Sequence, residues 1–271
     1  MQFEAILFDC DGVLVDSELI TNRVLHAMLN ESGWTLSEDE CMRIFIGKTV
    51  RSETARIEAE TGKPLTDAWM AAFYERRNTR LRAERGAISG AREAVRSEAQ
   101  RIQQETGQPL TDAWMAAFYT RRNARLSAEL QAIPGAVQTV RTLHAQLGGR
   151  IACASGADLA KVQMQLAQVG LAPYFGAHVF SGHDLPRTKP WPDVYLAAAA
   201  SLGVDPARCL VIEDSVPGLT AGVRAGATVW GYCPRVNAHS TPESLMTAGA
   251  SMVFDDMADL PRLLAQANAT A

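Results

Sequence analysis

The segment AILFDCDGVLVDSE, residues 5 to 18, decides how this chain folds. It begins with four apolar residues and continues with Asp9 and Asp11, which are separated by one cysteine. Burial of a carboxylate is costly unless the carboxylate is paired or bound to a metal. Two carboxylates at the end of an apolar run therefore need a chemical reason. We interpret Asp9 and Asp11 as site residues that follow a buried strand.

Five further short apolar runs alternate with helical patterns in the second half of the chain. They are RIACAS (150–155), AHVFSG (177–182), RCLVIEDS (208–215), ATVWGYC (227–233) and SMVFDD (251–256). Nearly continuous apolar strands that alternate with helices indicate a parallel sheet covered on both faces. We expect an α/β fold with a Rossmann-like, doubly wound core over residues 1–16 and 134–271. Residues 17–133 would form an inserted, all-helical domain.

A tandem duplication lies inside this insert. Residues 51–95 and 96–140 align without gaps, and 31 of the 45 positions are identical. Trp114, Phe118 and Leu126 recur at helical spacing in the second copy, which predicts a helix with one apolar face. In the first copy, we expect the helix over 64–88 to continue or bend gently into 91–106. We read the aromatic stripes as core packing, with a ligand groove as the alternative.

Composition and charge exclude several classes of protein. The net charge of −4 gives no sign of a nucleic-acid surface. No apolar run approaches the roughly 18 residues of a membrane span, and no signal-peptide pattern opens the chain. The five cysteines show no CxxC spacing, and Cys10, Cys153 and Cys209 fall in apolar runs. We expect reduced core thiols and a cytoplasmic protein.

Polar residues gather where the predicted strands end. Ser155 ends one run, Lys189 precedes a helix, and Glu213 and Asp214 end another run. Ligands bind beyond the carboxyl ends of the strands in open α/β sheets. Carboxylates without histidine or cysteine partners favour a hard cation such as Mg²⁺. Ser155 and Lys189 suit a phosphate group, and an aspartate can act as a nucleophile.

These motifs together carry a resemblance. FDCDGVLVDSE, Ser155, Lys189–Pro190 and VIEDSVPG resemble the four motifs of the haloacid dehalogenase superfamily, in its β-phosphoglucomutase-like branch. SAELQAIPGA, VFSGHDLPRTKPWPD and VIEDSVPG also resemble sugar-acid phosphatases such as 6-phosphogluconate phosphatase. The resemblance covers nearly the whole chain once one repeat copy is set aside, and it implies that the insert is a cap domain.

The resemblance implies a role for each motif residue. Asp9 would be the nucleophile and a metal ligand, and Asp11 the general acid and base, whose backbone carbonyl also binds Mg²⁺. Ser155 would bind the transferred phosphoryl group and Lys189 would neutralise its charge. Asp214 would be a metal ligand, which Glu213 supports directly or through water. Further substrate contacts are predicted at Gly12, Gly156 and Lys48.

Several activities stay open at this point. A Mg²⁺-dependent phosphatase for small phosphorylated metabolites is the preferred reading. A phosphomutase of the same branch would carry a histidine ten residues after Asp11, where this chain has Thr21. A dehalogenase would lack Asp11. A scaffold that has kept the fold is a further alternative, since the duplicated cap helices could form a homodimer contact.

Overall fold

The computed structural model describes residues 3–31, 37–45, 112–235, 238 and 240–269. It divides into two units, one formed by Met1–Glu18 with Leu126–Ala271 and the other by Leu19–Arg125. The predicted boundaries lay at residues 16/17 and 133/134. Each unit is described below by itself.

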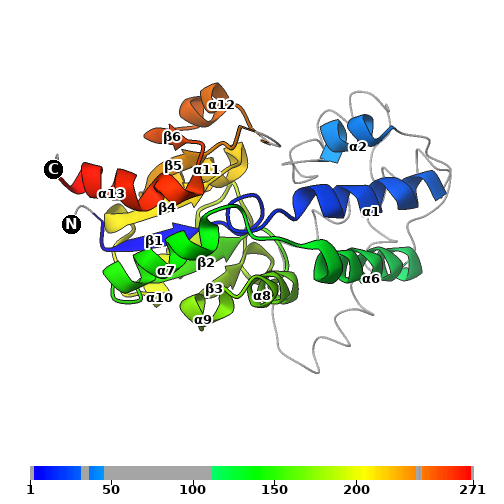
Figure 1. Cartoon of the computed structure of the whole chain (residues 1–271), viewed down its shortest axis with the longest axis horizontal. Helices are drawn as coiled ribbons and strands as arrows, with labels where there is room; N and C mark the ends of the chain where they lie inside the picture. The colour runs from blue at the N-terminus through cyan, green and yellow to red at the C-terminus, as the bar shows by residue number, and fades with distance from the viewer. Residues whose placement is uncertain (1–2, 32–36, 46–111, 236–237, 239, 270–271) are drawn as a thin grey trace. The chain divides into compact units, whose positions relative to one another are not determined.

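The first unit contains a six-stranded sheet in the order β3-β2-β1-β4-β5-β6, in which every pairing is parallel (Figure 1). The strands are β1 Ala5–Phe8, β2 Ile151–Ser155, β3 Val179–Ser181, β4 Cys209–Glu213, β5 Thr228–Tyr232 and β6 Met252–Phe254. All six match the apolar runs predicted from the sequence, so the parallel α/β fold is confirmed. Residues of β1, β2 and β4 are buried throughout, because helices cover both faces of the sheet.

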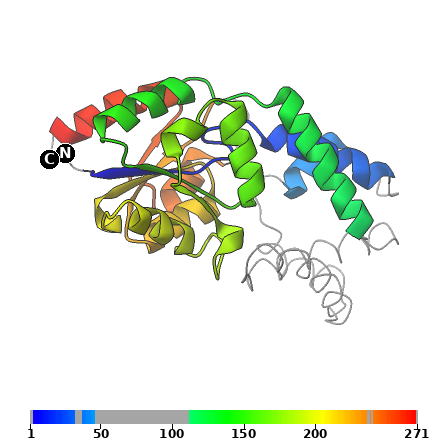
Figure 2. The same cartoon turned by 90° about the horizontal axis from the view of Figure 1, so that it is seen from below.

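Helices alternate with these strands along the chain. They are α7 Ala136–Gln146, α8 Leu159–Gln168, α9 Ala172–Phe175, α10 Asp193–Ser201, α11 Val216–Arg224, α12 Pro242–Thr247 and α13 Leu260–Ala269, with the 3-10 helices η2 Gly182–Asp184, η3 Pro206–Arg208 and η4 Met257–Asp259. Figure 2 shows α7 in green and α13 in red on one side of β1, and α10 and α11 in yellow on the other.

The two faces of the sheet bury different side chains. Tyr195 of α10 and Leu219 of α11 pack with Leu7 and Val211 in a single apolar cluster. Phe8 points the other way, and its ring meets the ring of Phe175 at a centroid distance of 6.1 Å. Successive strand residues point to opposite faces, so this alternation follows from strand geometry.

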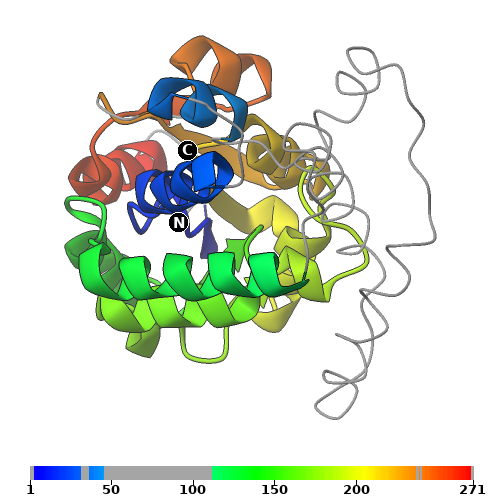
Figure 3. The same cartoon turned by 90° about the vertical axis from the view of Figure 1, so that its right-hand side faces the viewer.

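The described part of the second unit is helical. It holds α1 Glu18–Glu31, α2 Glu38–Phe45 and most of α6 Asp112–Glu129, drawn in dark blue, light blue and green in Figure 3. Ser37 caps α2, because its hydroxyl accepts from the N–H of Glu40 at 3.2 Å while Glu40 accepts from the N–H of Ser37 at 2.8 Å. Arg23 Nε lies 2.8 Å from Oε1 of Glu38 and thereby links α1 to α2.

Some predictions concern residues outside the described ranges. These are the whole first repeat copy, the continuous helix from 64 to 106, Lys48, and the side chains of Trp114 and Phe118. Leu126, the third member of the predicted apolar face, is buried. None of the helices in the described residues combines the length and apolar character that crossing a bilayer requires.

Candidate active site

Asp9, Lys189 and Glu213 form a buried ion-pair cluster at the point where the strand order reverses. Asp9 follows β1, Glu213 ends β4, and Lys189 lies in the loop before α10. Lys189 Nζ lies 2.5 Å from Oδ1 of Asp9 and 2.6 Å from Oε1 of Glu213. It also donates to the carbonyl oxygen of Ala154 at 2.9 Å. Three segments far apart in sequence therefore converge where ligands bind in open parallel sheets.

Burial and charge set the protonation of this cluster. Burial raises the pKa of Asp9 to about 7; Lys189 opposes the rise, and Glu213 adds to it. Burial alone would lower the pKa of Lys189, but Asp9 and Glu213 together raise it well above its ordinary value. Lys189 is therefore a permanent ammonium facing two carboxylates. The raised pKa shows that the negative charge of Asp9 is unfavourable in this buried place, and a bound cation would offset that cost.

Glu213 is an anchor for the residues around it. Its Oε1 accepts from Lys189 and from the hydroxyl of Tyr195 at 2.7 Å. Its Oε2 accepts from the backbone N–H groups of Asp214 and Ser215, each at 3.1 Å, and from the Ser215 hydroxyl at 3.0 Å. Because protein donors engage both oxygens, this geometry favours a positioning role for Glu213 over direct metal ligation.

Asp11 has a separate set of partners. Its Oδ1 accepts hydrogen bonds from the Ser17 hydroxyl, from Nζ of Lys161 at 2.8 Å and from Nε2 of Gln165 at 2.9 Å. Burial alone would raise the pKa of Asp11, but Lys161, Ser17 and Gln165 lower it to about 2. Asp11 is thus ionised while Asp9, two residues earlier, resists ionisation.

Ser155 is the buried last residue of β2. The register of β1 with β2 pairs Phe8 with Cys153, so Ser155 lies at the same sheet edge as Asp9. Its hydroxyl oxygen accepts from the N–H of Ala157 at 3.0 Å. The next helix, α8, begins only at Leu159, after Asp158 caps it. Ser155 therefore belongs to the strand end.

The two predicted glycines occupy turns beside these residues. Gly12 has a φ of 78°, a left-handed conformation that glycine adopts without strain, and its N–H donates to the carbonyl of Val15 at 2.9 Å. This turn directly follows Asp11. Gly156 follows Ser155, and a side chain there would meet no atom within 4 Å. Lys48 lies outside the described residues.

A group of carboxylates fits a hard divalent cation. Asp9, Glu213 and Asp214 each offer an oxygen atom, and the three atoms lie within 4.8 Å of one another. All three residues are buried. An all-oxygen donor set of this charge suits Mg²⁺ better than a softer metal. The fit supports the predicted metal site.

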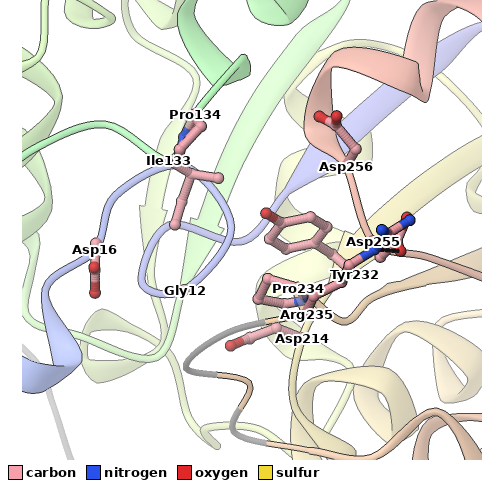
Figure 4. Close-up of a pocket in the computed structure, with 10 residues that line it drawn as sticks. All are labelled: Gly12, Asp16, Ile133, Pro134, Asp214, Tyr232, Pro234, Arg235, Asp255 and Asp256. Carbon is pink, nitrogen blue, oxygen red and sulfur yellow. Dashed lines mark hydrogen bonds and ion pairs between the residues drawn. The ribbon is translucent and has the colours of Figure 1, made fainter.

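A cavity of about 530 Å³ opens beside Asp214. Figure 4 shows Gly12, Asp16, Ile133 and Pro134 on one side, and Tyr232, Pro234, Arg235, Asp255 and Asp256 on the other. Burial raises the pKa of the Tyr232 phenol to about 12, helped by Asp256 and Asp214. Tyr232 therefore stays a hydrogen-bond donor. Carboxylates that line the cavity can accept hydrogen bonds from the hydroxyl groups of a ligand.

Four site residues escaped the sequence reading, namely Ser17, Lys161, Gln165 and Tyr195. Lys161 and Gln165 lie four residues apart in α8, and both are buried. Residues at i and i+4 lie on the same face of a helix, and a helix that covers a sheet normally packs an apolar face against it. Two polar residues on that face could therefore have been recognised in the sequence as site candidates. Tyr195 gave no such signal, because a buried tyrosine is ordinary in a core.

Comparison with known proteins places the chain in a family. The model of the haloacid dehalogenase-like hydrolases matches residues 3–226, a range that includes Asp9, Asp11, Ser155, Lys189, Glu213 and Asp214. The chain belongs to this family. A haloacid dehalogenase family hydrolase from Deinococcus radiodurans R1, solved with bound phosphate and sodium, is 30% identical, with a TM-score of 0.67. That match covers 98% of this chain and 97% of the other.

Two curated relatives of this haloacid dehalogenase-like chain are named as phosphatases. The 6-phosphogluconate phosphatase of Escherichia coli (strain K12) is 26% identical over 97% of this chain and 95% of its own length. Hexitol phosphatase B of the same species is 41% identical, but over only 28% of this chain and 33% of its own. A putative beta-phosphoglucomutase from Thermotoga maritima, 20% identical with a TM-score of 0.64, shares the fold. Family and relatives together support a phosphatase.

Proposed function

We propose that the chain is a Mg²⁺-dependent phosphatase that hydrolyses small sugar or sugar-acid phosphates through an aspartyl-phosphate on Asp9. The observation that carries the proposal is the buried contact between Lys189 and Asp9 at the switch point of the sheet, with Asp11 two residues further on. A carboxylate in this setting can serve as a nucleophile, and a second carboxylate can handle the proton.

In the first half of the reaction, a carboxylate oxygen of Asp9 attacks the phosphorus atom. The bond between phosphorus and the ester oxygen breaks, and that oxygen takes a proton from Asp11 as it leaves. Ser155 donates a hydrogen bond to a phosphoryl oxygen, and Lys189 offsets the negative charge that gathers there. Asp11 is ionised in the empty site, so it must gain its proton as the phosphate dianion approaches it.

In the second half, Asp11 takes a proton from a water molecule. The water oxygen attacks phosphorus, the bond between Asp9 and phosphorus breaks, and inorganic phosphate leaves. Asp9 regains its carboxylate and Asp11 its proton. Asp9 thus alternates between an acyl phosphate and a free carboxylate, Asp11 alternates between its protonated and ionised forms, and water is the second substrate.

Mg²⁺, when bound, would neutralise charge on Asp9 and on the phosphate. Asp9, Asp214 and the backbone carbonyl of Asp11 are the groups that we propose to hold it. Glu213 would act through its neighbours, because it orients Lys189 and the backbone of Asp214 and Ser215.

The substrate class rests on the relatives and on the cavity. Two relatives are named for 6-phosphogluconate and hexitol phosphates, and both compounds are phosphorylated polyols. The carboxylate-lined cavity beside Asp214 supports a leaving group with several hydroxyls. We also propose that residues 17–133 form the cap that the family resemblance implies, that the protein is cytoplasmic, and that the duplicated helices offer a homodimer contact.

The test is phosphate release from p-nitrophenyl phosphate, 6-phosphogluconate, hexitol phosphates and hexose phosphates, with Mg²⁺ or EDTA. We expect Mg²⁺-dependent release that Asp9→Asn abolishes. Mass spectrometry of the quenched enzyme should find a phosphoryl group on the peptide containing Asp9. Asp205→Asn is the matched control, because Asp205 is an exposed cap of η3, which precedes β4, whereas Glu213 ends that strand, and asparagine also caps.

Other outcomes point elsewhere. A phosphate that moves between hydroxyls of one sugar, without release, would identify the phosphomutase alternative. A folded protein that turns over none of these compounds would overturn the proposal and favour a scaffold.

A further inference from the structure

Two residues of α8 hold the acid–base aspartate by one oxygen. Lys161 and Gln165 lie one helical turn apart, and both side chains are buried. Lys161 Nζ and Gln165 Nε2 reach Oδ1 of Asp11 at 2.8 Å and 2.9 Å, and the Ser17 hydroxyl meets the same oxygen. All three donors thus converge on a single carboxylate oxygen.

We propose that Lys161 and Gln165 are positioning residues for Asp11, and this inference rests on the proposed function. With Oδ1 held by an ammonium and an amide, the carboxylate plane is fixed and Oδ2 is the oxygen that exchanges the proton. A carboxyl group that could rotate freely would present a proton to the ester oxygen in only a fraction of its orientations.

Stability alone is a weak reason for such a pair. A buried ion pair often contributes no more than well-packed apolar residues would, because both charges lose their hydration. The side chain of Lys161 is only 8% exposed and that of Asp11 is 13% exposed. A methionine-sized apolar residue would suit a helix that covers a sheet. The presence of a lysine at position 161 therefore indicates that this side chain positions Asp11.

A contact with Cys10 fixes the orientation of the Gln165 side-chain amide. Cys10 Sγ lies 3.7 Å from Oε1 of Gln165 and can donate to it, which turns the amide nitrogen toward Asp11. Cys10 lies between the two aspartates in sequence, and the chain Cys10–Gln165–Asp11 ties their loop to α8.

The inference has a kinetic signature. In Lys161→Met, the first half-reaction should slow when the leaving group is an alkoxide that needs a proton. It should slow far less for p-nitrophenyl phosphate, because nitrophenolate leaves without one. The second half needs Asp11 as a base for water whatever the substrate was. The variant should therefore accumulate aspartyl-phosphate from the nitrophenyl ester.

The experiment is stopped-flow and steady-state kinetics of wild type, Lys161→Met and Gln165→Leu. We expect Lys161→Met to lower kcat for the best sugar phosphate on the order of 100-fold. We expect a burst of nitrophenolate that approaches one per enzyme, together with a lower KM for that ester because hydrolysis of the intermediate is then its slow step. The KM for the sugar phosphate should stay within about threefold of wild type. Gln165→Leu leaves the ion pair between Lys161 and Asp11 intact, so its fall in kcat and its burst should be smaller than those of Lys161→Met. Gln163→Ala, exposed on the same helix, is the control that should match wild type.

Three results separate the possibilities. Equal rises in KM for both substrates would show that Lys161 binds the substrate directly, and would overturn the inference. Unchanged kcat without a burst, in both folded variants, would overturn it as well. A wild-type enzyme that releases no phosphate from any ester would refute the proposed function itself.

Discussion

A methyl group added at Gly218 would lie 1.7 Å from Oε1 and 2.0 Å from Cδ of Glu213. Gly218 lies in the first turn of α11, directly above the carboxylate that holds Lys189 and Tyr195. The glycine is therefore a steric requirement of the site. It lets a helix approach the buried end of β4 closely enough for Ser215 to bond to Glu213.

Gly218→Ala should consequently be harmful. In an exposed helix interior the same change usually stabilises by about 1 kcal/mol. Here we expect the free energy of unfolding to fall by about 2 kcal/mol, because the new methyl must displace a buried carboxylate. Phosphate release should drop at least roughly tenfold, since Lys189 loses its alignment. Urea titration measures the free energy of unfolding, and a phosphate assay measures the rate of release. Val223 is exposed on the same helix, so Val223→Ala is the control and should stay near wild type. A Gly218→Ala variant more stable than wild type would contradict this steric explanation.

Tyr195→Phe removes one donor from Glu213 and nothing else. Tyr195 is fully buried, and its hydroxyl lies 2.7 Å from Oε1 of Glu213. We expect a loss of about 1 to 2 kcal/mol in the free energy of unfolding, because an acceptor in the core is left with one partner fewer. Tyr174→Phe is the matched control, since that hydroxyl bonds to Arg141 at the surface. Equal effects of the two changes would argue against a special role for Tyr195.

Asp9→Asn should stabilise the metal-free protein at neutral and higher pH. The folded pKa of Asp9 is raised from 3.8 to about 7, chiefly by burial. A group of this kind contributes stability that is present below pH 3.8 and is lost as the pH rises through about 7. Asparagine has no proton to lose. In EDTA at about pH 8, we expect the variant to exceed wild type by about 2 to 4 kcal/mol.

The pH dependence is the test of that prediction. The difference between Asp9→Asn and wild type should shrink as the pH falls toward about 5. Urea titrations in EDTA at several pH values measure it. A gap that is constant with pH, or a variant less stable at pH 8, would show that Asp9 does not carry the raised pKa.

Mg²⁺ should raise the melting temperature of the wild type but not that of Asp214→Asn. A ligand that binds only the folded state stabilises it by about 2.7 kcal/mol at 100 times its Kd. Asp214 is buried beside Asp9, so removal of its charge should greatly weaken cation binding. Differential scanning fluorimetry with and without Mg²⁺ measures the shift. Asp205→Asn should keep the full shift, and an equal shift in Asp214→Asn would place the metal elsewhere.

The sheet and its catalytic edge could be read from the sequence for local reasons. Strands buried on both faces must be apolar throughout, and that requirement marks AILF, IACAS and CLVIE directly. A carboxylate that follows such a run is conspicuous, because burial makes it costly. Asp9 and Glu213 were singled out in this way, and Ser155 was singled out as the polar end of another apolar run. Asp158 capping α8 was equally local, since a cap bonds to a residue three positions away.

Only the tertiary structure decided which of these groups meet, and through which atoms. The bonds from Lys161 and Gln165 to Asp11 span 150 and 154 residues, and no local pattern encodes such pairings. Glu213 is held by donors from α10 and from the 214–215 turn, and these contacts support its proposed role as an anchor. The sequence by itself determined the strands, the helices around them and the chemical character of the edge. The packing of helices on the sheet determined how far each charge is buried and which partner it has, because both depend on residues that folding alone brings together.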